Sequence, residues 1–171
     1  MKVTRQLARL ESLVLNPLRG LSDDEWHRAP KGKWTVAQIV EHLSISVDLV
    51  AGLFEKRANK KGMRRRATPV QGLLRHLILG LETIPPGLRA PEAARPSEKP
   101  DPELMLAQFR MGVERLKAFV EQWPEERQLQ VFVRHPLLGD LNLPEWVRFH
   151  YLHNRHHARQ MEDRLEWARK Q

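Results

Sequence analysis

The sequence contains no cysteine in its 171 residues. This absence excludes disulfide bonds and thiolate metal sites, so a transition metal would have to be held by imidazole and carboxylate groups. The placement of the 8 histidines is therefore the first question to ask of this chain.

Long hydrophobic runs are also missing. Residues 1–6 lack the continuous apolar segment of a secretion signal, and no later stretch approaches the roughly 20 apolar residues of a membrane span. We therefore expect a cytoplasmic protein that does not associate with membranes. The length suits one domain, over residues 1–171, which can bury about 70% of the surface of its unfolded chain.

Acidic residues are the minority. The chain has 21 Asp and Glu against 29 Lys and Arg, for a formal net charge of +8, which raises nucleic acid or an acidic surface as a partner. Much of the excess lies in residues 56–66, which read as a helix end followed by a solvated loop. No zinc-finger spacing or RNP-type aromatic motif accompanies this basic segment. We therefore do not expect a nucleic-acid partner. A basic helical module that binds nucleic acid is kept as the alternative hypothesis to a metal-binding protein.

Helix start signals recur along the chain, and they divide it into segments without any need for strands. Capping boxes begin at Ser22 and Thr35, and a cap precedes proline at Thr68, Asp101 and Asn142. Residues 131–133 form a brief extended piece with no strand to pair with. Helices are predicted from 2 to 16, a short turn around Trp26, from Thr35 through Phe54, from Thr68 through Leu81 with an apolar face of Leu73, Leu74, Leu77 and Leu81, from Asp101 to the residue before Pro124, and from Asn142 to about Lys170.

Proline is concentrated in residues 83–102, where six prolines forbid regular structure over most of the stretch. Neither half of the chain supplies enough apolar helix faces to close a core alone, so this segment is predicted to be a crossover within one bundle. The expected fold is all-α: an up-and-down four-helix bundle with one inserted short helix and one long proline-rich crossover.

Half of the histidines lie in residues 150–157 of the last predicted helix. His150, His153 and His157 share one helix face, whereas His156 points elsewhere. The shared face continues the apolar stripe, so these rings stand where core side chains are expected. Two imidazoles at positions i and i+4 can bind one metal ion, whereas a lone histidine on such a stripe is usually a hydrogen-bonded core residue.

A site that uses this cluster needs a ligand from a facing helix. His27 and His135 lie in turn-rich stretches, and His76 lies on the inserted short helix. His42 lies in the middle of a long helix beside its apolar face, so its ring is directed toward the edge of the core. By itself His42 reads as a partly buried histidine bonded to a neighbour, but together with the C-terminal cluster it would complete a three-imidazole site.

Two segments resemble a known family. Residues 33–43, KWTVAQIVEHL, look like the N-terminal signature of the DinB/YfiT-like superfamily, and residues 153–160, HNRHHARQ, look like its C-terminal one. The resemblance covers nearly the whole chain, and residues 135–146 are similar to one branch of that superfamily. It implies a four-helix bundle that binds zinc or nickel through His42, His153 and His157, with water completing the coordination. It leaves His150 outside the usual triad, as a second-shell or substitute candidate, and makes His156 a neighbour that does not bind.

The resemblance implies two kinds of metal-dependent activity. Superfamily members include S-transferases that use low-molecular-weight thiols and proteins described as metal-dependent hydrolases, so a small-molecule substrate is expected. Dimers occur among them, which makes a homodimer an expectation here. No catalytic residue is assigned: Glu41, Asp48 and Glu145 are the nearest carboxylates, each with an ordinary surface or capping role, and Gln160 could hydrogen-bond a ligand. A third hypothesis is a non-catalytic bundle with a structural metal.

Overall fold

The computed structural model describes residues 3–58, 60, 62–85 and 87–171. Four long helices form the body of the molecule: α1 (Val3–Leu15), α3 (Val36–Arg57), α5 (Pro102–Gln122) and α7 (Leu143–Ala168). The shorter elements are η1 (Asn16–Leu18), α2 (Asp23–His27), α4 (Pro69–Arg75), η2 (His76–Gly80), η3 (Glu92–Ala94), α6 (Glu125–Gln130), β1 (Phe132–His135) and β2 (Gly139–Asn142).

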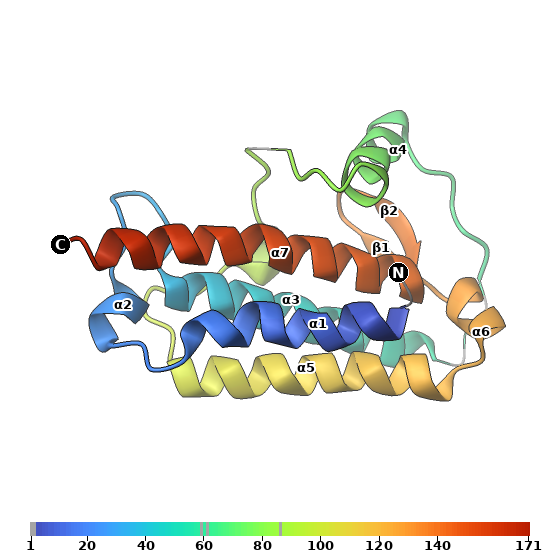
Figure 1. Cartoon of the computed structure of the whole chain (residues 1–171). Helices are drawn as coiled ribbons and strands as arrows, with labels where there is room; N and C mark the ends of the chain where they lie inside the picture. The colour runs from blue at the N-terminus through green and yellow to red at the C-terminus, as the bar shows by residue number, and fades with distance from the viewer. Residues whose placement is uncertain (1–2, 59, 61, 86) are drawn as a thin grey trace.

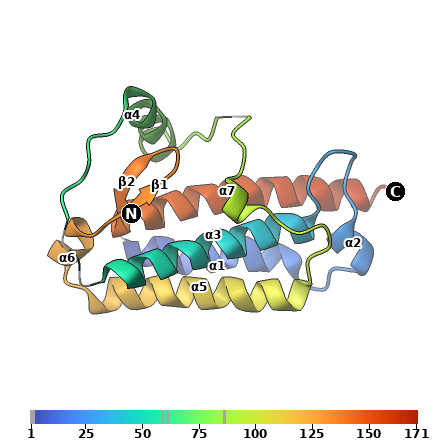
Figure 2. The ribbon, with the colours of Figure 1, turned by 180° about the vertical axis from the view of Figure 1, so that it is seen from behind.

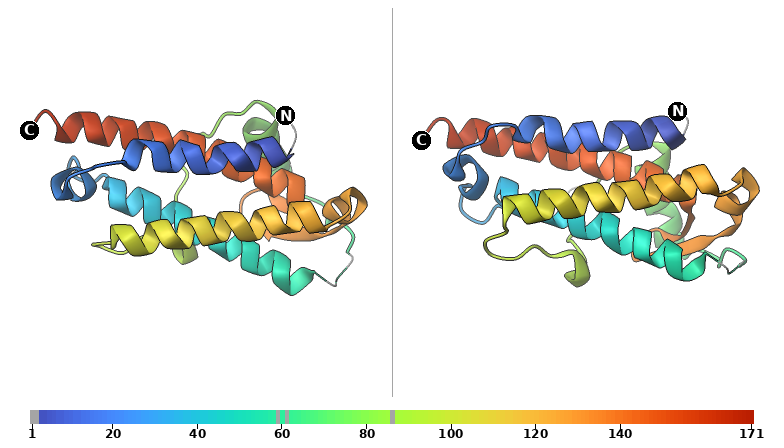
Figure 3. Two further views of the ribbon diagram at one scale, coloured as in Figure 1. Left: turned by 60° about the horizontal axis from the view of Figure 1, so that its bottom comes forward. Right: turned by 90° about the horizontal axis from the view of Figure 1, so that it is seen from below.

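The long helices pack in two pairs. Helix α1 lies along α7, and α3 lies along α5, as the two views of Figure 3 show. After α3 the chain passes through α4 and then returns along the bundle, so that α5 runs in the same direction as α3 (Figures 1 and 2). The predicted all-α bundle with a long proline-rich crossover is confirmed.

The predicted caps are present at the helix starts. Ser22, Thr35, Thr68 and Asn142 each form a complete capping box, in which the cap side chain accepts from the backbone N–H three residues on. Asp101 accepts from two backbone N–H groups at the start of α5. These bonds satisfy donors that a helix leaves free at its first turn, which explains why these signals located the helix starts accurately.

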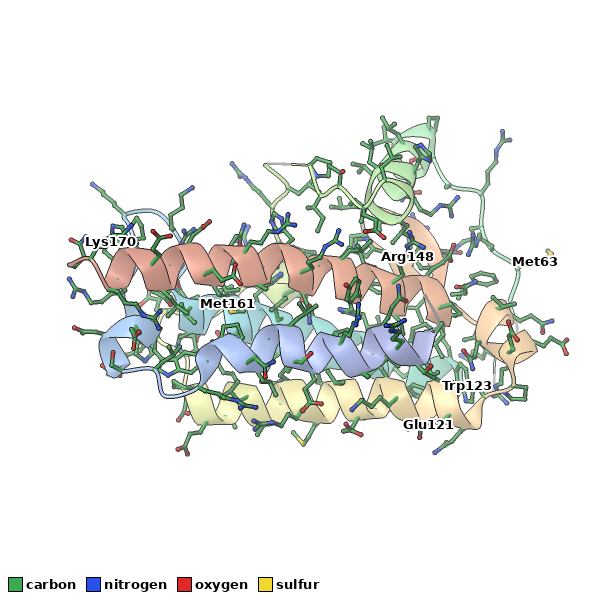
Figure 4. The ribbon with its side chains drawn as sticks, viewed as in Figure 1. Met63, Glu121, Trp123, Arg148, Met161 and Lys170 are labelled. Atoms are coloured by element: carbon green, nitrogen blue, oxygen red, sulfur yellow. The ribbon has the colours of Figure 1, made fainter. Side chains whose placement is uncertain are left out.

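The core runs between the four long helices. Val14, Val40, Phe54, Phe109 and Leu116 are fully buried there. Met161 of α7 points into the bundle, whereas Met63, on the connection between α3 and α4, projects away from it and is 94% exposed (Figure 4). The long helices therefore bury one face each, as their apolar periodicity predicted.

The expectation of an unpaired extended piece at residues 131–133 was wrong. Strand β1 pairs with β2 as an antiparallel hairpin, in which His135 lies opposite Gly139. Gly139 has a φ of +77°, a backbone conformation that favours glycine, so this residue permits the tight turn. The hairpin leads directly into α7 and fixes where that helix begins.

The inserted helix has close to the predicted extent, as α4 followed directly by η2, but it exposes part of its leucine face. Leu73 and Leu81 are each 59% exposed, and the buried residue is Ile78. Ile78 lies in η2, a π-helical turn that follows α4. A π-helical turn is wider than an α-helical one and changes which side chains face the core. The apolar spacing of an unbroken α-helix therefore did not predict the burial of Ile78.

By length and composition alone, α3 could cross a membrane, although no segment of the sequence was predicted to do so. In the structure 56% of its apolar window is buried inside the bundle. Its apolar residues are thus explained by packing against α5 and α7.

Candidate metal centre

Three histidine rings meet between α3 and α7. The Nε2 atom of His153 lies 3.2 Å from Nε2 of His42 and 3.1 Å from Nε2 of His157. His42 and His157 are buried, and His153 is partly exposed at the same point. The structure therefore brings together the three residues that the sequence singled out, with one nitrogen of each facing a common centre.

The crossover orients the first of these rings. His42 Nδ1 lies 2.6 Å from the carbonyl oxygen of Ala94, in the short helical turn η3. A carbonyl oxygen only accepts, so His42 donates from Nδ1 and keeps a free lone pair on Nε2. The crossover is held to α3 beside this contact, because Glu41 accepts hydrogen bonds from the backbone N–H and hydroxyl of Ser97.

Gln160 treats the two C-terminal rings of the cluster differently. Its Oε1 lies 2.8 Å from His157 Nδ1, and its Nε2 lies 3.1 Å from His156 Nε2. With the amide in this orientation, His157 donates from Nδ1 and keeps its Nε2 lone pair for the centre, while the Nε2 lone pair of His156 is occupied by the amide. Of the two roles open to Gln160 from the sequence, the hydrogen bond to a candidate ligand is the one that agrees with this geometry.

The rings are neutral at ordinary pH. Burial lowers the pKa of His42, and the hydrogen bond to Ala94 offsets part of that effect. Burial also lowers the pKa of His157 to about 3, and burial together with the neighbouring imidazoles holds the pKa of His153 well below its usual value. Neutral imidazole is the form that binds a metal ion.

The distances of 3.1 and 3.2 Å from Nε2 of His153 to the other two Nε2 atoms fit a small divalent ion. Metal–nitrogen bonds of about 2.0–2.1 Å in a tetrahedral arrangement separate two ligand nitrogens by about 3.3 Å. Two of the three Nε2 atoms are acceptors because of their Nδ1 partners, so only His153 can place a proton among them. One proton is poorly shared between two acceptors, whereas a cation would satisfy all three lone pairs.

His150 stands beside the centre without joining it. It is 1% exposed, and neither ring nitrogen has a hydrogen-bond partner among the described residues. Its ring stacks against Trp146, and burial lowers its pKa to about 3. The shared helix face was therefore correctly predicted for His150, but no hydrogen bond links it to His153 or His157.

The hairpin supplies a histidine that the sequence reading left aside. Nδ1 of His135 accepts from the backbone N–H groups of Leu137 and Leu138, which leaves its proton on Nε2. The ring packs between Trp146 and Phe149, and burial lowers its pKa to about 4. Gly139, a turn signal between two short apolar runs, was the feature of the sequence that could have placed His135 on a paired strand.

The three carboxylates considered as proton-transfer groups are engaged elsewhere. Glu41 binds Ser97, Asp48 is ion-paired with Arg115, and Glu145 completes the capping box of α7 and pairs with Arg64. None of them is free to act at the three imidazoles. Their ordinary structural roles, which the sequence favoured, agree with these contacts.

The centre lies in the wall of a large open pocket. The pocket has a volume of about 920 Å³ and is bordered by α3, α7, the crossover and the hairpin turn. All three Nε2-bearing rings line it, together with Trp34 and Phe149. A molecule in this pocket would therefore reach the point on which the three nitrogens converge.

Part of the basic segment is neutralised within the fold. Arg65 forms hydrogen bonds through Nε and Nη2 to the buried carboxylate of Asp140, and Arg64 is ion-paired with Glu145. These contacts bind the connection after α3 to the hairpin and to the start of α7. Arg64 and Arg65 thus have a structural role that the picture of a solvated loop did not include.

Comparison with known proteins identifies a family but no near relative. No curated protein and no solved structure matches the chain. The family model of the DinB superfamily matches residues 5–161, a span that contains all four long bundle helices up to Met161 and all three imidazoles of the centre. The chain belongs to the DinB superfamily.

Proposed function

We propose that His42, His153 and His157 bind one divalent metal ion, zinc or nickel, and that the protein is a metal-dependent enzyme of small-molecule chemistry. The observation that carries the proposal is the convergence of three Nε2 atoms, two of them 3.1–3.2 Å from the third, with Nδ1 bonded to Ala94 or Gln160 in two of the rings. Such outer contacts orient imidazole ligands and increase their basicity.

The ligand number favours a catalytic centre over a structural one. Among the described residues, the cluster contains three groups of the types that bind metals, and no fourth joins it. Structural zinc sites are closed by four protein ligands, whereas catalytic sites keep three and an open position. Here the open side would face the pocket, where a substrate can enter.

A divalent ion held by these three residues would lower the pKa of a water or thiol at its open position and would so supply a hydroxide or thiolate nucleophile. Side chains and one backbone carbonyl of the chain itself, that of Ala94, do the rest. His42, His153 and His157 hold the centre at the pocket wall, Ala94 and Gln160 keep two rings in the correct tautomer, and Trp34 and Phe149 shield the rings from bulk water. We therefore propose thiol transfer with a low-molecular-weight thiol, or hydrolysis, as the reaction class.

A cobalt(II) titration of tag-free, metal-free protein tests the site and separates the two reactions. The proposal predicts one bound ion per chain, with visible absorption bands typical of low coordination numbers. Thiol transfer predicts that cysteine adds a sulfur charge-transfer band, whereas hydrolysis predicts no such band and a metal-dependent cleavage of p-nitrophenyl acetate. His153→Ala should abolish these signals, and His156→Ala, which removes a neighbouring ring whose Nε2 accepts from Gln160 instead of facing the centre, should keep them.

Two results would contradict the proposal in different ways. Binding of clearly less than one ion per chain would remove the metal site. The second result is one tightly bound ion with no spectral response to thiol and no metal-dependent turnover of either substrate type. It would favour a non-catalytic bundle with a structural metal over an enzyme.

A further inference from the structure

The charged lining of the pocket is almost entirely of one sign. Among the residues that the structure describes, Asp48 is the only acidic one in the lining, and it is ion-paired with Arg115. A cleft lined by one sign of charge attracts ligands of the other sign. Six basic side chains border the pocket: Lys33, Lys56, Arg89, Arg115, Arg134 and Arg164.

Two of these cations are linked to the imidazole centre through Trp34. Arg164 follows His157 by seven residues and Gln160 by four, so the three share one face of α7. Nε of Arg164 donates to the carbonyl oxygen of Trp34 at 3.2 Å, and the Trp34 ring lies 5.2 Å from the His42 ring. This contact ties the guanidinium to the segment that carries Lys33 and Trp34, on the side of the centre toward the C-terminal end of α7.

The charges of these two residues are uncompensated. Neither Arg164 nor Lys33 forms an ion pair with any residue that the structure describes, and the Nη groups of Arg164 have no hydrogen-bond acceptor there. A guanidinium with both Nη groups free can bind a planar oxyanion such as carboxylate in a bidentate manner.

The pocket wall on the other side of the centre is apolar. Leu49 and Leu53 of α3 line it while being 42% and 39% exposed, and Ile84 and Leu137 face them from the crossover and the hairpin. Leu49 is two helical turns beyond His42, a distance of about 10 Å along the axis. An apolar ligand body of several carbons would cover these side chains.

We infer that the pocket binds an amphipathic oxyanion, with its anionic group at Arg164 and Lys33, its reacting group at the three imidazoles and its apolar body extending from there toward Leu49 and Leu53. This assignment of substrate class rests on the proposed function, because it places the reaction at that centre. The positive charges of Arg164 and Lys33 and the apolar wall belong to the chain itself, so the ligand can be recognised without a bound metal.

Calorimetric titration of metal-free protein with octanoate and with 1-octanol tests the inference. Removing the metal eliminates direct attraction of the carboxylate to an ion. At low ionic strength we expect octanoate to bind about tenfold more tightly than the uncharged alcohol, and affinity to rise about two- to fourfold per added methylene from butyrate to octanoate. Lys33→Gln/Arg164→Gln should abolish the preference for the anion.

The matched control is Lys31→Gln/Arg159→Gln, which removes the same charge from exposed positions close in sequence but outside the pocket lining. This control variant should still bind octanoate more tightly than octanol. Lys33→Gln alone, at an exposed position, should reduce the preference severalfold, and this variant serves if the double variant does not fold. Equal binding of octanoate and octanol by the unaltered protein, or equal losses in the double variant and its control, would overturn the inference. Because no metal is present, these outcomes are independent of whether the imidazoles bind an ion.

Discussion

At the scale of single residues, the tautomers distinguish two of the three ligand candidates from His156. His42 and His157 each donate from Nδ1, to Ala94 and Gln160, and so direct an Nε2 lone pair toward His153. The same Gln160 amide occupies the lone pair of His156. His156 and His157 are adjacent in α7 but have different roles, because Gln160 binds one ring through its amide nitrogen and the other through its amide oxygen.

Replacing Gln160 should weaken metal binding without removing a ligand. In Gln160→Ala, His157 loses the acceptor for its Nδ1 proton, and we expect about 10- to 100-fold weaker zinc binding, measured by competition with a chelator of known affinity. Gln160→Glu keeps an acceptor at this position and should recover most of the affinity. Equal losses in both variants would show that the hydrogen bond to His157 does not orient the ligand.

The sequence could identify the three imidazoles but not everything around them. The helix face of His153 and His157, the position of His42 and the family resemblance together selected the triad. The carbonyl oxygen of Ala94 leaves no mark in a sequence, because any residue supplies one. His135 was missed because its role depends on a hairpin turn that brings backbone N–H groups to its ring.

At the scale of elements, the close approach of α5 to α3 depends on Gly112. A Cβ atom there would lie 2.7 Å from Cγ1 of Val47 and 3.1 Å from the backbone nitrogen of Asp48, so α3 itself would have to move. We expect Gly112→Ala to lower the free energy of unfolding by about 1–3 kcal/mol, despite the better helix propensity of alanine. Urea unfolding measures this change.

Gly72 provides the matched control within a helix. A Cβ atom added there meets nothing within 4 Å. Gly72→Ala should leave the stability unchanged or raise it by up to about 1 kcal/mol. If both substitutions had the same effect, the packing of α5 on α3 would not be as close as described.

The tether between the basic segment and the hairpin should depend on pH. Hydrogen bonds from the Arg65 side chain lower the pKa of Asp140, which is 5% exposed. A carboxylate with a lowered pKa in the folded state contributes stability that is complete above its unfolded pKa of about 4 and is lost as the pH falls through the folded pKa. Asp140→Asn should therefore cost about 1–3 kcal/mol at pH 7 and progressively less in acid.

The control for Asp140→Asn is Asp24→Asn, which removes a carboxylate from an exposed pair with Arg28 at 3.5 Å. This substitution should change the free energy of unfolding by no more than about 0.5 kcal/mol. Denaturant unfolding of both variants from pH 7 to pH 3 makes the comparison. A cost of Asp140→Asn that does not diminish in acid would mean that its ion pair with Arg65 is not the source.

The elements that the sequence predicted are those with local signals. The caps at Ser22, Thr35 and Asn142 marked helix starts because the cap bonds are made within four residues. The hairpin β1–β2 needs two segments to pair, and the burial of Ile78 depends on a π-helical turn, so neither follows from the local apolar pattern. Tertiary contacts decided these features.

At the scale of the whole molecule, the crossover is part of the proposed centre. It passes from α4 along the bundle, borders the pocket and supplies the carbonyl oxygen of Ala94 to His42 (Figure 2). The three rings come from two long helices that are far apart in the chain. A metal bound by them would therefore join α3 to α7 and stabilise the folded state as a whole.

Zinc at 100 times its dissociation constant should stabilise the fold by about 2.7 kcal/mol, which corresponds to a rise in Tm of about 5–10 °C for a chain of this size. Differential scanning calorimetry with zinc and with a chelator measures the shift. His156→Ala should show the same rise and His153→Ala none. A rise that persists in His153→Ala would mean that the ion binds elsewhere on the fold.

Anomalous diffraction at the absorption edge of the metal, from crystals of the metal-loaded protein, tests the central claim most directly. We expect one strong peak between α3 and α7, at about 2.0–2.1 Å from the Nε2 atoms of His42, His153 and His157, with an open side toward the pocket. No peak at that position, or a peak held by His150 or His156 in place of one of the three, would contradict it.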